Sequence, residues 1–253
     1  MGLEICVDSV QSAAAAEAGG AQRVELCSAL IEGGLTPSLG LIRAVCSRVD
    51  IGVHVMIRPR GGDFLYSEED LSVMRADIEE AARSGADGVV LGVLSAEGDV
   101  DVERTRALVE LAQPMQVTFH RAIDMTRDLE KSLEDVIRTG AVRVLTAGGE
   151  QTAMLGRARI RTMVQQAKGR ICVMAGGGVR AANVQEIMQA TGATEFHAAL
   201  RASLPSPMKF QGHKVRLGDA GVDGYTRRGV RSGDVKVLRQ RMEEARSTHG
   251  GGA

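Results

Sequence analysis

The chain has 253 residues, a formal net charge of -1, 44% hydrophobic residues and only 2% aromatic residues. This length fits one large α/β barrel or two small domains, and the apolar content is enough for a sizeable aliphatic core. The near-zero net charge argues against a general nucleic-acid binder. Since no apolar run approaches the roughly 20 residues of a membrane span, we expect neither nucleic-acid nor membrane partners.

The N-terminus and the cysteines indicate a cytoplasmic protein. Residues 1–6 lead directly into an expected strand, so we predict no signal peptide. The four cysteines are unevenly spaced and include no CxxC pair. This usage is typical of reduced cytosolic thiols rather than of a disulfide framework. Cys46 and Cys172 lie among apolar neighbours, and we interpret both as core residues.

Strand-like and helix-like segments alternate along the chain. Strands are predicted over 3–7, 23–26, 52–57, 88–91, 116–119, 143–146, 170–175 and 195–198. Segments rich in Ala, Leu, Glu and Arg predict helices over 10–18, 38–49, 68–84, 102–112, 129–138, 160–167, 183–190 and 235–245. Eight strand–helix units in a chain of this length predict a single (β/α)₈ TIM barrel, an α/β fold with its functional face at the strand C-termini.

A weak internal repeat supports the barrel. A Gly-Ala pair precedes every second strand, beginning at Gly20, Gly85, Gly140 and Gly192. Glycine suits the left-handed cap that ends a helix, so the pairs indicate repeated double units. Since no linker interrupts the chain, we predict one domain over 1–253, with its core over about 3–200. We interpret the polar stretch 201–231 as a long final loop and 249–253 as a flexible tail.

The predicted barrel interior is unusually polar. Period-two alternation separates the side chains that point inward from those that face the helices. The inward set is Glu4, Cys6, Asp8, Arg23, Glu25, Cys27, His54, Met56, Arg58, Gln116, Thr118, His120, Glu195 and His197. Buried charges must be paired or coordinated, so we interpret the deepest residues, Glu4, Arg23 and Glu195, as a structural network. Nearer the rim, both a structural and a functional role stay open.

Several long motifs resemble the CutC copper-homeostasis family. The matching segments are 4–10, 23–27, 32–38, 53–66, 92–94, 118–122, 145–149, 174–179 and 195–197. The resemblance covers residues 3 to about 210 and thins beyond Gln211. It implies a (β/α)₈ barrel, a cytoplasmic location, a homo-oligomer (homodimer or homotetramer) and a link to copper tolerance. Family members often have Pro-Gly-Gly-Gly where this chain has Ala175 before three glycines, a change that we expect to matter little.

The copper function implied by this resemblance attaches to Cys6 and Cys27. Both cysteines end neighbouring parallel strands on the inward face, and neighbouring strands lie about 4.8 Å apart. Two thiolates, with Met56 nearby, form a soft site suited to Cu(I). The alternative is that both are small buried apolar residues. We predict a Cu(I) site at this pair.

A competing interpretation is an enzyme that acts on a small anionic or phosphorylated metabolite. Three glycines end the seventh strand, where many barrels hold a phosphate on backbone N–H groups. Neighbouring arginines would clamp the anion with bidentate geometry. The predicted anion-binding set is Arg58, Arg60, Arg121, Gly176, Gly177 and Gly178. The glycines are also compatible with a tight turn alone.

An enzyme would also need groups that move protons. Glu25, His120 and Asp124 are the candidates for general acid–base catalysis. We expect His120 to turn into the barrel mouth towards the side that carries Glu25, with a pKa near neutrality. The sequence reveals neither a substrate nor a bond to be broken.

Overall fold

The computed structural model describes residues 1–212 and 225–249, which contain a closed barrel of eight parallel strands. The strands are β1 (Gly2–Val7), β2 (Arg23–Leu26), β3 (Gly52–Met56), β4 (Gly88–Leu91), β5 (Gln116–Phe119), β6 (Arg143–Thr146), β7 (Cys172–Ala175) and β8 (Glu195–Ala198). Each strand pairs with its sequence neighbour, and β8 pairs with β1 to close the barrel. The predicted (β/α)₈ fold is therefore confirmed.

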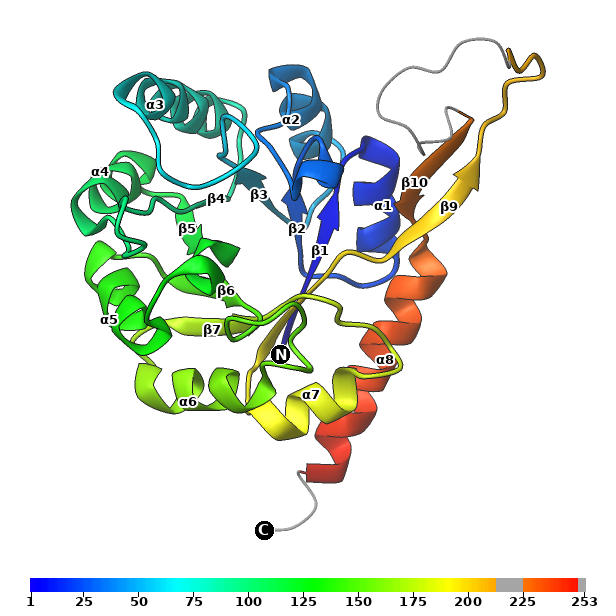
Figure 1. Cartoon of the computed structure of the whole chain (residues 1–253). Helices are drawn as coiled ribbons and strands as arrows, with labels where there is room; N and C mark the ends of the chain where they lie inside the picture. The colour runs from blue at the N-terminus through cyan, green and yellow to red at the C-terminus, as the bar shows by residue number, and fades with distance from the viewer. Residues whose placement is uncertain (213–224, 250–253) are drawn as a thin grey trace.

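Helices surround the strands, as Figure 1 shows. They are α1 (Val10–Ala18), α2 (Leu39–Cys46), α3 (Glu68–Arg83), α4 (Val102–Ala112), α5 (Leu129–Thr139), α6 (Arg157–Ala167), α7 (Val184–Thr191) and α8 (Ser232–His249). Short 3-10 helices, η1 (Leu30–Glu32) and η2 (Arg121–Met125), follow β2 and β5. The bounds agree closely with the prediction, except that α2 ends three residues earlier, α6 begins three residues earlier and α8 extends further at both ends.

Local signals in the sequence set the helix ends. At the start of α3, the Ser67 hydroxyl accepts a hydrogen bond from the Asp70 N–H while the Asp70 carboxylate accepts one from the Ser67 N–H. This capping box satisfies two N–H groups that the helix itself cannot pair. Gly140 and Gly192 end α5 and α7 with φ of 87° and 71°, as the Gly-Ala repeat predicted.

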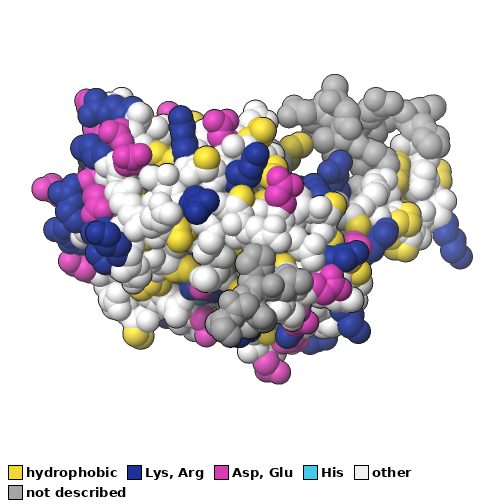
Figure 2. Space-filling view, turned by 90° about the horizontal axis from the view of Figure 1, so that it is seen from below, with side chains coloured by type: hydrophobic (Ala, Val, Ile, Leu, Met, Phe, Trp, Pro, Cys, Tyr) yellow, Lys and Arg dark blue, Asp and Glu magenta, His cyan; other side chains and the backbone are white. Residues whose placement is uncertain are grey.

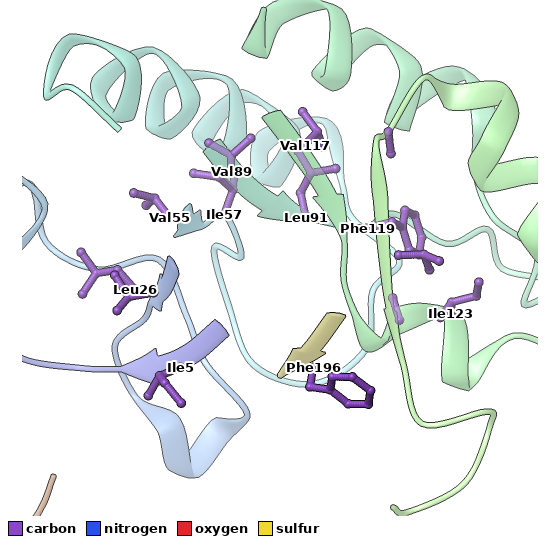
Figure 3. Close-up of a cluster of buried hydrophobic side chains, with 14 of the residues drawn as sticks. Ile5, Leu26, Val55, Ile57, Val89, Leu91, Val117, Phe119, Ile123 and Phe196 are labelled. Atoms are coloured by element: carbon purple, nitrogen blue, oxygen red, sulfur yellow. The ribbon is translucent and has the colours of Figure 1, made fainter. Parts of the chain in front are cut away.

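The hydrophobic core lies between the strands and the helices. Side chains on the outer face of the barrel, such as Ile5, Leu26, Val55 and Phe196, are fully buried there (Figure 3). Burial of an aliphatic or aromatic side chain of this size contributes about 1.5–3 kcal/mol. Successive strand residues point to opposite faces of the sheet. Because the apolar residues face the helices, the polar residues between them point into the barrel.

The segment after β8 corrects the sequence prediction. Instead of one loop over 201–231, β9 (Arg201–Pro205) and β10 (Thr226–Val230) pair antiparallel, and Figure 1 shows this hairpin projecting beside α1. The Val230 N–H donates to Ser12 Oγ of α1 at 3.2 Å. Most side chains of both strands are partly or fully exposed, so no apolar periodicity marked them, and backbone hydrogen bonds carry the pairing.

Other parts of the predicted C-terminal region have different outcomes. Residues 213–224 of the expected loop and 250–253 of the expected tail lie outside the described residues. His249, predicted to begin the tail, instead ends α8.

Charges of both signs are interspersed on the molecular surface. Figure 2 shows this for one face, where basic and acidic side chains lie beside one another. Exposed ion pairs such as Arg170–Glu134, 2.7 Å apart, contribute little to stability, because water and salt screen the two charges. Within residues 1–212 and 225–249, no helix combines the length and apolarity that a bilayer crossing requires.

Candidate metal and anion site

A network of ion pairs fills the barrel interior near the amino-terminal ends of the strands. Arg23 pairs with the fully buried Glu4, and its Nη2 donates to Glu195 Oε2 at 2.7 Å. Arg143 Nε donates to the same oxygen at 2.6 Å, and its Nη1 donates to Thr118 Oγ1 at 3.3 Å. The predicted pairing of Glu4, Arg23 and Glu195 is confirmed. We call Glu4, Arg23, Arg143 and Glu195 the floor network.

A cavity of about 250 Å³ opens above the floor network, towards the carboxyl ends of the strands. This is the end at which TIM barrels place their functional sites. Its chemically active wall residues are Cys6, Glu25, Met56, Arg58, His120, Arg121, Gly177, Gly178, His197 and Arg201. The apolar remainder includes Leu30, Phe64 and Leu145. The cavity therefore brings residues of both predicted sites, for metal and for anion, into one space.

Two buried thiols lie beside the cavity, on β1 and directly after β2. The Sγ atoms of Cys6 and Cys27 are 3.9 Å apart, and Cys6 lines the cavity. Cys27 is completely buried, with its Sγ 3.5 Å from Glu25 Oε2. Met56 packs in the same cluster of buried side chains. We call Cys6 and Cys27 the thiol pair.

His197 belongs to this group, although the sequence analysis assigned it no role beyond an inward direction. Its Nδ1 lies 2.7 Å from Glu4 Oε1, and its Nε2 lies 3.9 Å from Glu25 Oε2. Because β8 closes the barrel against β1, His197 stands opposite Glu4 in the strand register. The closure of a predicted eight-stranded barrel is the signal that could have placed it beside the cysteines.

The close packing of these groups shifts their pKa values in opposite directions. The hydrogen bond with Cys27 is the main cause that lowers the pKa of Cys6 to about 5, against the effect of burial. Burial, reinforced by the charge of Cys6, raises the pKa of Glu25 well above its usual range. Burial opposes a charged His197, but the neighbouring Glu25, Cys6 and Glu4 raise its pKa. The arrangement favours a Cys6 thiolate beside a protonated His197.

Two overlapping sets of ligand atoms are close enough to hold a metal ion among the described residues. One set is Cys6, Glu25 and Cys27, the other is Glu4, Glu25 and His197, and the atoms of each lie within 4.8 Å of one another. The first set offers two sulfur atoms and suits a soft ion such as Cu(I), whereas the second offers only oxygen and nitrogen. The donor chemistry of the thiol pair therefore fits the predicted copper.

Arg58 lines the cavity, but most of its guanidinium is occupied. Its Nη1 donates to the carbonyls of Glu32 and Gly34 at 2.6 and 3.1 Å, and its Nη2 to the carbonyl of Gly62 at 2.8 Å. These bonds hold the loops after β2 and β3 together. Nε, buried and without a partner among the described residues, is the donor left over.

His120 also lines the cavity, in surroundings that differ from the prediction. Instead of a carboxylate, the Phe64 ring lies 4.8 Å from its own ring. Its Nδ1 accepts a hydrogen bond from the Ala122 N–H at 3.3 Å, while Nε2 is buried without a partner in the described structure. Burial and the charge of Arg58 lower the pKa of His120 to about 3. At neutral pH the imidazole is therefore uncharged, and its one N–H proton is on Nε2.

Asp124 holds the loop after β6 in place rather than lining the cavity. Its carboxylate accepts hydrogen bonds from Thr146 Oγ1 and from the N–H groups of Ala147 and Gly149. It also accepts one from Arg121 Nε at 2.7 Å. Both carboxylate oxygens are thus occupied, and Asp124 is not among the residues that line the cavity.

Of the three consecutive glycines, two line the cavity and one does not. Gly177 and Gly178 line it, with φ of 92° and 72°. Gly176 does not, because the space of its missing Cβ is taken by Leu145, while His197 Cβ lies 3.2 Å away. Gly176 therefore permits close packing, and of the three glycines predicted to bind an anion only Gly177 and Gly178 reach the cavity.

The structure does not bring Arg60 to the cavity. Its guanidinium pairs with Asp63 and Asp70, each at 3.1 Å, and lies over the Tyr66 ring at the start of α3. Arg201 lines the cavity rim instead, with its Nη2 3.6 Å from Asp8 Oδ2. Because Arg201 lies in the stretch interpreted as a loop, no pattern in the sequence indicated that it reaches the site.

The fold and the site define a TIM-barrel protein with a buried pair of thiols beside a cavity at the strand C-termini. The chain belongs to the CutC family, whose sequence model matches residues 1–202. It is 51% identical over 216 residues to the copper homeostasis protein cutC homolog of Mus musculus. The aligned segment covers 85% of this chain and 79% of that protein.

Two further comparisons extend this relationship. A CutC family protein of Chromobacterium violaceum is 48% identical over 243 residues, 96% of this chain and 98% of that protein. The crystal structure of a copper homeostasis protein CutC from Streptococcus agalactiae is similar with a TM-score of 0.74 and 34% identity, covering 78% of this chain and 97% of that chain. The described barrel is thus the CutC fold, and copper homeostasis is the context in which its relatives are named.

Proposed function

We propose that this protein acts in copper homeostasis by binding Cu(I) through Cys6 and Cys27. The carrying observation is that the two Sγ atoms are 3.9 Å apart, with Cys6 on the wall of a cavity. If Cu(I)–thiolate bonds are close to the 2.3 Å of zinc–thiolate bonds, one ion spans two sulfur atoms separated by up to about 4.6 Å. The pair can therefore hold one ion with little rearrangement.

The surroundings of the thiol pair support a soft monovalent ion. Met56 brings a thioether into the same buried cluster, which also contains Val90 and has Leu30 packed against it. Soft sulfur ligands select Cu(I) over harder ions. Because thiols bind metals as thiolates, loading is expected to release the proton held by Cys27.

A competition titration tests the proposal. Reduced wild-type protein should take Cu(I) from a chromogenic chelator at one ion per chain, whereas Cys6→Ser and Cys27→Ser should each weaken affinity by at least about 100-fold, since a hydroxyl is a much harder ligand. Cys172→Ser is the matched control, because Cys172 is half-buried on β7 and does not line the cavity. Unchanged stoichiometry and affinity in both cavity variants would reject the site.

A cytoplasmic location and assembly as a homodimer or homotetramer complete the proposal. Membership of the CutC family supports both, and the reduced state that a copper-binding thiol pair requires supports the location. Light scattering of the purified protein tests the assembly, and a mass equal to one chain would contradict it.

A second candidate function is an enzyme acting on a small anionic or phosphorylated metabolite. The observation that favours it is that Glu25 Oε1 and His120 Nε2 are buried at the cavity without partners in the described structure. Glu25, with its raised pKa, would act as the general acid and His120 would donate a hydrogen bond. Such an enzyme must hold the charged group of its substrate, which can be tested before the reaction is known.

A further inference from the structure

We propose that the cavity binds a small phosphate-bearing molecule, whose phosphate is held by Arg121, the His120 Nε2–H and the backbone N–H groups of Gly177 and Gly178. These residues lie on the β5 and β7 side of the cavity, away from the thiol pair on the β1 and β2 side. The site uses neither thiol, so it does not depend on copper binding. It is a prerequisite for the enzyme candidate without requiring that any reaction occurs.

Arg121 presents one end of its guanidinium to this site. Nε donates to Asp124 at 2.7 Å and Nη2 donates to the Glu150 carbonyl at 2.8 Å, so the group is already fixed. Nη1 has no partner among the described residues, and it lies 3.4 Å from the position that a Cβ of Gly177 would take. A guanidinium fixed in advance loses little conformational entropy when it binds an anion.

The glycine loop presents donors rather than acceptors. The Gly177 carbonyl accepts from the Ala153 N–H at 2.9 Å, and the Gly178 carbonyl accepts from Asn183 Nδ2 at 2.9 Å. The N–H groups of both glycines donate to no acceptor within the described part of the chain. A Cβ at Gly177 would stand 3.2 Å from Ala147 Cβ, so a larger residue would crowd the loop. Fixed, unpartnered N–H groups are well suited to an oxyanion.

The buried side chains around the site also have donors to spare. His120 is 4% exposed and Arg58 is 6% exposed, yet His120 Nε2 and Arg58 Nε have no partners in the described structure. Because His120 Nδ1 accepts from the backbone, its Nε2 is a donor. Buried donors of this kind are normally satisfied by a ligand or by water. On the side of the cavity away from the thiol pair, these unpartnered donors, one of them charged, favour an anion.

The shape of the cavity narrows the class of ligand. Donors from η2, from the loop after β7 and from the end of β3 line the same cavity, so an anion bound there can accept hydrogen bonds from several elements at once, which suits the three terminal oxygens of a phosphate. Leu30, Met56 and Leu145 give the remaining wall an apolar character. A volume of about 250 Å³ accommodates a small organic phosphate.

Calorimetric titration of the copper-free protein tests the proposal with inorganic phosphate, phosphoglycolate and glycolate as probes. Phosphate and phosphoglycolate should bind, and glycolate should bind more weakly. Arg121→Ala should weaken phosphoglycolate binding by about tenfold or more, because it removes a charged hydrogen-bond donor. Arg60→Ala is the matched control, since Arg60 follows the same strand as Arg58 but pairs outside the cavity, and it should bind as the wild type does.

Each result has a defined meaning. Absence of phosphate and phosphoglycolate binding, equal losses in both arginine variants, or tighter binding of glycolate would overturn the proposal. If Arg121→Ala does not fold, phenylglyoxal modification of Arg121 in the wild type replaces it. Inorganic phosphate should slow that modification, and an unchanged rate would also overturn the proposal. Cys27→Ser should keep phosphoglycolate affinity, so a failed copper titration and a failed phosphate titration remain separate findings.

Discussion

The floor network and the cavity above it both contain buried polar and charged side chains. Those of the floor network are paired, whereas several in the cavity have no partner among the described residues. The charges of the floor network pair with one another and with their neighbours. In the cavity, Glu25 Oε1, His120 Nε2 and Arg58 Nε are buried without partners among the described residues. A buried polar group without a partner costs about 1–3 kcal/mol. The difference separates charges that stabilise the barrel from polar groups that are available to a ligand.

The largest expected change in the free energy of unfolding comes from replacing one of two buried glutamates, Glu4 in the floor network or Glu25 in the cavity. Comparing the two variants tests whether the two regions differ. Glu4→Gln removes a charge paired with Arg23 and His197, and should lower the free energy of unfolding by about 3–5 kcal/mol. Glu25→Gln replaces a carboxyl whose raised pKa favours the protonated form, and should cost less than about 1 kcal/mol. Urea denaturation at neutral pH measures both. Equal losses would contradict the division into two layers.

His54 sharpens the comparison through the pH dependence of stability. Burial, with the charges of Arg23 and Arg143, lowers its pKa from 6.5 to about 4. The unfolded chain therefore binds more protons between these values, and stability should fall as the pH decreases from 6.5 towards 4. A difference of 2.5 pKa units corresponds to about 3 kcal/mol.

The variant His54→Gln isolates this contribution. Its unfolding free energy should decline less than that of the wild type over the same pH range, because Gln does not titrate. Urea denaturation of both proteins at several pH values provides the measurement. Parallel curves for the two proteins would show that His54 does not control acid stability.

A pair of glycine substitutions has the smallest expected effect. A Cβ at Gly88 would stand 2.6 Å from His54 Nε2, so Gly88→Ala should overpack the interior and cost about 1–3 kcal/mol. A Cβ at Gly40 meets nothing within 4 Å, so Gly40→Ala in α2 should stabilise by about 0.4–1 kcal/mol. Thermal denaturation should shift in opposite directions, and a stabilised Gly88→Ala would show that the interior is loosely packed.

The sequence predicts the barrel well because its strands carry strong periodic signals. Leu3, Ile5 and Val7 alternate with Glu4 and Cys6. This alternation predicts both the strand and the face that points into the barrel. The β9–β10 hairpin carries no such signal, because its residues are mostly exposed and it is held by backbone pairing and a contact with α1. Elements that depend on backbone hydrogen bonds with distant segments leave little trace in local composition.

The site was predictable only where strand alternation still applied. Alternation correctly brought Cys6 and Cys27 together, since both lie on or next to regular strands. Arg58 and Arg60 follow the same strand, but Arg60 lies two residues further into the loop, where its direction depends on Asp63 and Asp70. Interactions across the fold decide such positions, and one sequence does not show them.

The floor network also determines how material can pass through the barrel. Its paired charges occupy the interior at the amino-terminal ends of the strands, directly beneath Cys6 and His197. The barrel interior is consequently closed at the end where the strands begin and open at the end where they finish. A Cu(I) ion bound at the thiol pair, as we propose, would enter and leave by the same opening, so loading and release would not occur at the same time. Any exchange partner has to approach the same rim, which Arg121 and Arg201 line.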